Sequence, residues 1–61
     1  MRSIREILMQ RDQMSSTEAE LLISDAQAQF HEYLAEGDQE SAYGICKEFF
    51  GLEPDYLFDI L

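Results

Sequence analysis

Two side chains of this 61-residue chain could act as a nucleophile and its base, namely Cys46 and His31. A catalytic cysteine needs a neighbouring base that accepts the proton of its thiol. Cys46 lies at a predicted core position, where cysteine behaves as a small hydrophobe. His31 lies in a different predicted helix, and nothing in the sequence brings the two together. We therefore do not expect nucleophilic catalysis.

The thirteen aspartates and glutamates could serve metal binding or acid–base chemistry. Metal binding fails on ligand count, because the residues four positions before and after His31 are Gln27 and Ala35. The acidic residues also lack the spacing and central glycine of a calcium loop. A catalytic pair of carboxylates needs a desolvated cleft that separates their pKa values, and we find no residues to build one. We expect no enzyme activity, no metal and no cofactor.

The charge balance favours a different activity. Thirteen acidic residues against four lysines and arginines give a formal net charge of −9. This charge repels nucleic acid and anionic lipid and attracts basic protein surfaces, although acidity also simply keeps a small protein soluble. Direct DNA binding is not expected, because the helix after the predicted turn at Gly37 offers only Lys47 for phosphate contacts.

Length and composition set further limits. We expect a single helical domain over residues 1–61, which buries only about 60% of its unfolded surface as a monomer. Partner binding or oligomerisation is therefore a natural source of additional burial. The single cysteine allows no intrachain disulfide. No apolar run reaches the length of a signal peptide or a membrane span, so we expect a cytoplasmic protein that does not bind membranes.

Helical periodicity and capping residues predict an all-α fold. We expect a small bundle of three to four helices, at about residues 3–11, 16–36, 39–50 and 54–61, packed around the long second helix. Ser15 and Glu18 form a capping box at the start of that helix, and Gly37 ends it in a left-handed conformation. Its core face repeats apolar residues at intervals of three and four, namely Ala19, Leu22, Ile23, Ala26, Phe30, Tyr33 and Leu34.

The shorter helices show the same kinds of ends. Ser3 and Glu6 form a second capping box, Asp38 caps the third helix, and Pro54 suits the first turn of the fourth. Gly44 lies on the outward side of the third helix, where it either weakens the helix or admits the backbone of a partner. The arginines of the first helix either form a basic contact site or pair with the acidic long helix; they are Arg2, Arg5 and Arg11.

Two rows of residues lie outside the core face of the long helix. The first, which we call the acidic ridge, consists of Glu18, Asp25, Glu32 and Glu36. Beside it runs an apolar row at the same seven-residue interval, formed by Leu21, Ala28 and Ala35. Small residues let two helices approach closely, so this row favours self-association or a partner helix. Alanine is also simply a good helix former.

Aromatic residues are concentrated after residue 42, where they alternate with acidic ones. Aromatic anchors inside a charged rim are typical of protein interfaces. We assign Phe49 to the core, and we predict a partner-binding set of Tyr43, Phe50, Asp55, Tyr56 and Asp59. Alternatively, these aromatic side chains belong to the core, because a thin core needs large side chains and leaves their edges exposed.

The segments RDQMSSTEAE and GLEPDYLFDIL resemble small acidic helical proteins of bacteriophages and bacterial mobile elements. The resemblance is one of pattern and covers most of the chain. It implies no activity, but it implies a phage or prophage setting in the cytoplasm of a bacterial host, where such proteins bind host machinery. Such a turn would be expected to contain glycine where this sequence has Gln13, so we expect backbone strain at Gln13.

Two functional hypotheses follow. The first is a non-enzymatic interaction protein of phage type. It would bind a basic surface of a host nucleic-acid enzyme or defence complex through the acidic ridge and the aromatic anchors, partly by mimicking the charge of DNA. The second is a self-associating structural or regulatory module, such as an antitoxin-like subunit, whose homodimer is held by the Leu21 row.

Overall fold

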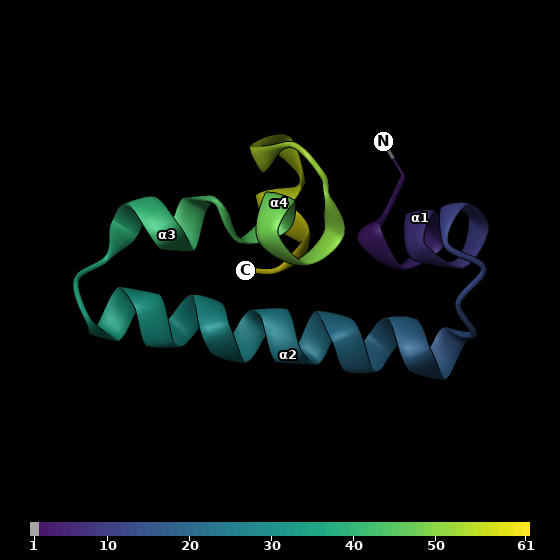
Figure 1. Cartoon of the computed structure of the whole chain (residues 1–61), viewed down its shortest axis with the longest axis horizontal. Helices are drawn as coiled ribbons and strands as arrows, with labels where there is room; N and C mark the ends of the chain where they lie inside the picture. Colours follow the sequence, from purple (N-terminus) through teal and green to yellow (C-terminus); the bar gives the residue numbers. More distant parts are fainter. Residues whose placement is uncertain (1) are drawn as a thin grey trace.

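The computed structural model describes residues 2–61 and is all-α, as predicted (Figure 1). Its elements are α1 (Ile4–Arg11), α2 (Ser16–Ala35), α3 (Gln39–Tyr43), α4 (Ile45–Phe50) and the 3₁₀ helix η1 (Pro54–Asp59). α2 runs along the longest dimension of the molecule, and α1, α3 and α4 pack against the same side of it. No helix within residues 2–61 is long and apolar enough to cross a membrane.

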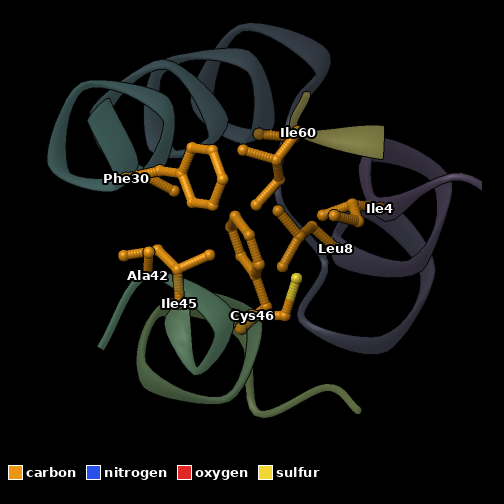
Figure 2. Close-up of a cluster of buried hydrophobic side chains, with 10 residues drawn as sticks. Ile4, Leu8, Phe30, Ala42, Ile45, Cys46 and Ile60 are labelled. Atoms are coloured by element: carbon orange, nitrogen blue, oxygen red, sulfur yellow. The ribbon is translucent and has the colours of Figure 1, made fainter. Parts of the chain in front are cut away.

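One cluster of buried apolar side chains fills the space between α2 and the other elements (Figure 2). Ile4 and Leu8 of α1 point towards Phe30 of α2 and Ile60 near the end of the chain. The cluster consists of Ile4, Leu8, Ala19, Ala26, Phe30, Ala42, Ile45, Cys46, Phe50 and Ile60. Leu34 was predicted to belong to the core face but is 40% exposed, because it lies at the edge of that face in the last turn of α2.

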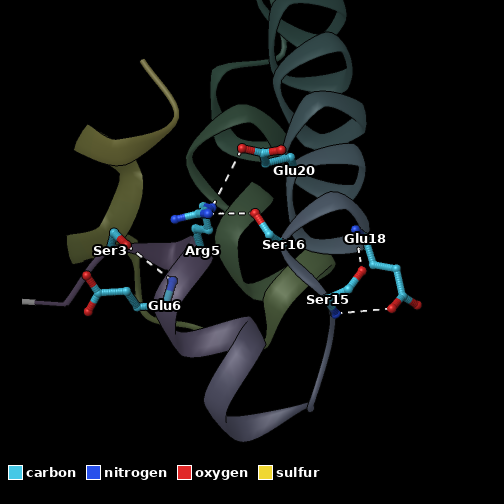
Figure 3. Close-up of polar contacts among 7 residues, drawn as sticks. All are labelled: Ser3, Arg5, Glu6, Ser15, Ser16, Glu18 and Glu20. Carbon is cyan, nitrogen blue, oxygen red and sulfur yellow. Dashed lines mark hydrogen bonds and ion pairs between the residues drawn. The ribbon is translucent and has the colours of Figure 1, made fainter.

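The ends of α2 confirm the predicted caps. The Ser15 hydroxyl accepts a hydrogen bond from the Glu18 amide, and the Glu18 carboxylate accepts one from the Ser15 amide, both at 3.1 Å (Figure 3). At the other end Gly37 has φ +77°, and the Asp38 amide donates to the Tyr33 carbonyl at 2.9 Å. This closing bond satisfies a carbonyl that the helix leaves unpaired.

The predicted third helix, 39–50, is wrong as a single element. The chain changes direction at Gly44, so that α3 runs along α2 whereas α4 is seen nearly end-on (Figure 1). A methyl group at Gly44 would meet only ordinary contacts, 3.6 Å from the Glu40 carbonyl, so glycine is not required by space. We attribute the break to the low helix propensity of glycine.

The predicted fourth helix, 54–61, is shorter and tighter than expected. Pro54 does occupy its first turn, but the element is a 3₁₀ helix that ends at Asp59. The Ile60 amide donates to the Leu57 carbonyl at 3.0 Å, three residues back. Short terminal segments commonly adopt this tighter geometry. Here it places Ile60, which is 2% exposed, in the core.

Three residues that follow helices have left-handed backbone conformations. Gly37 follows α2 and Gly51 follows α4, whereas the corresponding position after α1 is occupied by Gln13, with φ +56°. A side chain in this conformation brings Cβ too close to the following carbonyl oxygen. The backbone strain expected at Gln13 is therefore confirmed.

Candidate interaction surfaces

All four residues of the acidic ridge are exposed on α2. Glu18 is partly used by the fold, because hydrogen bonds from Ser15, chiefly from its backbone N–H, lower the pKa of the Glu18 carboxyl. Within residues 2–61 the ion pairs involve two other carboxylates, Glu20 and Asp12. Among these described residues no cation pairs with the rest of the ridge, which comprises Asp25, Glu32 and Glu36.

Of the three N-terminal arginines, Arg5 pairs with α2 as one of the two interpretations predicted, Arg11 contacts the end of α4, and Arg2 is exposed. The Arg5 guanidinium donates to the Ser16 hydroxyl and lies 3.6 Å from the Glu20 carboxylate (Figure 3). Arg11 does not reach α2. It pairs with Asp12 at 2.7 Å and donates to the Phe50 carbonyl at the end of α4, also at 2.7 Å. The hydrogen bond from Arg11 lowers the pKa of Asp12.

The end of α2 that is remote from α1 carries a group of carboxylates around the Tyr33 hydroxyl. This hydroxyl donates to the two Glu48 carboxylate oxygens at 3.1 and 3.3 Å. Glu48, then partial burial, and then the charges of Asp38 and Glu36 raise the pKa of Tyr33. We call Glu36, Asp38 and Glu48 the acidic end. Sequence reasoning missed it, because Tyr33 and Glu48 belong to different helices and no spacing relates them.

The apolar row lies outside the core, as predicted. Leu21 is 62% exposed, and Ala28 and Ala35 are exposed on the same face. Ser24 lies between Leu21 and Ala28 and is also exposed. The face of α2 opposite the core therefore has an uncharged stripe, with the acidic ridge along one side of it.

The aromatic prediction requires a correction at Phe50. Its side chain is 2% exposed and belongs to the core, whereas Phe49 is only half-buried. The break at Gly44 rotates α4 relative to the predicted continuous helix, so the two rings exchange the roles assigned to them. Phe50 is therefore not a surface anchor. Tyr43 is 54% exposed, as its predicted role requires.

The C-terminal part of the predicted set also changes. Asp55 is exposed, but Tyr56 is half-buried and packs against the core. The Asp59 carboxylate accepts a hydrogen bond from the Ile4 amide at 2.8 Å, so Asp59 caps α1 and is not free for a partner. Phe58, which sequence reasoning did not select, is 55% exposed. The three-residue spacing of Asp55 and Phe58, which places both on one face of a helix, was the available signal.

Cys46 and His31, the residues considered for catalysis, have different surroundings. Cys46 is fully buried, and burial followed by the charge of Asp59 raises the pKa of its thiol. His31 is exposed and meets the ring of Phe30 edge-on, with 5.7 Å between ring centroids. No group of three or more potential metal ligands occurs among residues 2–61. A surface groove of about 320 Å³ includes neither side chain; it is lined by Gly44, Lys47, Gly51, Leu52, Glu53 and Pro54.

Comparison of the chain with protein families, curated proteins and solved structures finds no match. The resemblance to phage proteins therefore stays a prediction from the sequence pattern.

Proposed function

We propose that the protein is a non-enzymatic interaction protein that binds a basic surface of another protein through α2. The observation that carries the proposal is the exposure of Asp25, Glu32 and Glu36 along one side of α2, while the ion pairs of the described chain involve other carboxylates. Unneutralised charges of one sign attract and orient a partner of opposite charge.

Apolar anchors beside the charges supply the burial that a specific complex needs. Leu21 is exposed next to the ridge on α2, whereas Tyr43 is exposed on α3, which packs against the other side of α2. Charge would then determine the speed and orientation of encounter, and these anchors would determine how long the complex persists.

In the phage setting that the sequence pattern implies, the partner is a host nucleic-acid enzyme or defence complex. Duplex DNA carries one charge per about 1.7 Å of axis. The charge density along the ridge alone is much lower, because its seven-residue interval gives one carboxylate per about 10 Å. The charge density of the whole molecule is closer to that of DNA, because a net charge of −9 over 34 Å gives about one charge per 4 Å. Charge mimicry therefore involves the whole acidic surface, with the ridge as one part of it.

Affinity capture from a bacterial host lysate tests this proposal with two variants of equal net charge. In the ridge variant, Asp25→Asn, Glu32→Gln and Glu36→Gln remove three ridge carboxylates. In the control, Glu6→Gln, Glu40→Gln and Glu53→Gln remove three exposed carboxylates outside α2. We expect a protein that the parent and the control retain and that the ridge variant loses. Equal retention by both variants would refute the role of the ridge.

Competition with duplex DNA tests the mimicry separately. If the captured protein uses its DNA-binding surface, an excess of duplex DNA releases it from the parent protein. Retention in the presence of DNA would remove the mimicry and leave the basic-surface interaction in place.

The exposed Leu21 favours a second candidate, a self-associating structural or regulatory module such as an antitoxin-like subunit. Its homodimer would bury the uncharged stripe of α2. The melting temperature would then rise with protein concentration, and Leu21→Glu would abolish that rise. Because two copies of charge −9 repel each other, added salt would strengthen this dimer, whereas salt weakens binding to a basic partner.

A further inference from the structure

The turn that joins α1 to the rest of the chain contains a residue with a strained backbone conformation. Asp12–Ser15 connects the two helices, and within residues 2–61 Gln13 is the non-glycine residue with positive φ. After α2 and α4 the same conformation is adopted by Gly37 and Gly51, for which it carries no steric cost. Any arrangement in which Gln13 leaves this conformation relieves the strain.

Most of the contacts that hold α1 are made to parts of the chain beyond the turn; the hydrogen bond from the Met14 amide to the Leu8 carbonyl, at 3.3 Å, belongs to the turn itself. Ile4 and Leu8 are fully buried in the shared core. The Ile4 amide donates to Asp59, Arg5 pairs with Glu20, and Arg11 donates to the Phe50 carbonyl. A second copy of the chain presents an identical site, so α1 of one copy can make every one of the contacts beyond the turn in the other.

Charge favours that exchange. Residues 1–12 contain three arginines and two acidic residues, whereas residues 13–61 contain one lysine and eleven acidic residues. The α1 segment is therefore weakly basic and the body that receives it is strongly acidic. Opposite charges attract the α1 segment of one copy to the body of another, even though two closed copies repel each other.

We propose that the Asp12–Ser15 turn is a hinge at which α1 exchanges between two copies of the chain, so that each α1 occupies the α1 site of its partner. An extended four-residue linker spans about 13 Å and frees Gln13 from its left-handed conformation. Strained short turns are known to promote such swapping. The proposal is independent of the ridge and of the Leu21 stripe.

The strain is tested by comparing two glycine variants. The strain of one non-glycine residue in the left-handed conformation changes an equilibrium constant about fivefold. The exchanged dimer relieves this strain in both of its chains, so the strain favours dimerisation about 25-fold. Gln13→Gly removes the strain from the closed monomer and should lower the dimer association constant by about that factor in analytical ultracentrifugation. Gln10→Gly places the same residue within α1, where no left-handed conformation is relieved, and should not lower it. An unchanged constant in Gln13→Gly would overturn the proposal.

Exchange is tested by cross-linking the Arg5→Lys variant, which places an amine beside Glu20. Equal amounts of ¹⁵N-labelled and unlabelled chains are unfolded together, refolded at high concentration, separated by size and coupled with a carbodiimide. In the dimer fraction we expect peptides that join position 5 of one isotope to Glu20 of the other. Cross-links within single-isotope chains only, or the absence of a dimer, would overturn the proposal.

Discussion

The two sides of α2 use their side chains in opposite ways. On the side that α1, α3 and α4 cover, Ala19, Ala26 and Phe30 are buried, and at the edge Glu20 is paired with Arg5. On the side that faces solvent, Leu21 and most of the acidic ridge have no role in holding the fold. The difference indicates that the covered side determines stability and that the solvent side remains available for a partner.

Two equal leucine truncations give the largest expected contrast. Leu8→Ala removes a fully buried side chain of α1 and should cost about 2–5 kcal/mol. A 61-residue domain has a total stability of about 3–9 kcal/mol, so this variant should lose a large part of its stability. Leu21→Ala, at a 62% exposed position, should change stability by less than about 0.5 kcal/mol. Urea unfolding followed by circular dichroism measures both, and equal losses would contradict the assignment of the two sides.

Two serine substitutions should give a smaller contrast at the start of α2. Ser15→Ala removes the hydroxyl that accepts from the Glu18 amide and should cost about 1 kcal/mol. Ser24→Ala, within α2 on its solvent side, should be neutral or slightly stabilising because alanine is the better helix former. If the two variants had the same midpoint in thermal unfolding, the capping box would not be the device that starts α2.

The pH dependence of stability should separate Glu18 from the rest of the ridge. Because the Glu18 pKa is lowered in the fold, its contribution is fully present above the unfolded value of about 4.3. It is lost as the pH falls below that value through the lower folded pKa. Glu18→Gln should therefore lose less stability than the parent between about pH 5 and pH 3. Glu32→Gln retains the capping box and should follow the parent in denaturant unfolding at each pH.

Neutralising the rest of the ridge should have the smallest effect on stability. The triple variant Asp25→Asn, Glu32→Gln and Glu36→Gln removes no ion pair among the described residues. We expect the free energy of unfolding of the triple variant to stay within about 0.5 kcal/mol of the parent value, with a tendency to rise because self-repulsion falls. A loss of several kcal/mol in urea would show that the ridge is structural.

Local sequence signals were sufficient for α2. Ser15, Glu18 and Gly37 interact with residues within one turn, so the start, the end and the outward rows of this helix could be predicted from spacing alone. Gln13 was identified from the resemblance to phage proteins, in which such a turn would be expected to contain glycine.

Contacts between distant segments could not be predicted. The hydrogen bond from the Ile4 amide to Asp59 spans 55 residues, and it converts a predicted binding residue into a cap. An isolated glycine is often tolerated inside a helix, so the local pattern around Gly44 did not indicate the break. That break also explains why Phe50 was misplaced.

The most direct measurement is the salt dependence of the dissociation constant between this protein and a purified captured partner, compared for the parent and the ridge variant. If the ridge contacts a basic surface, the affinity of the parent falls steeply as salt rises, because screening shortens the range of exposed charges to about 8 Å at physiological ionic strength. The ridge variant binds more weakly at low salt and shows a shallower dependence. Identical salt dependence in both proteins would contradict binding through α2.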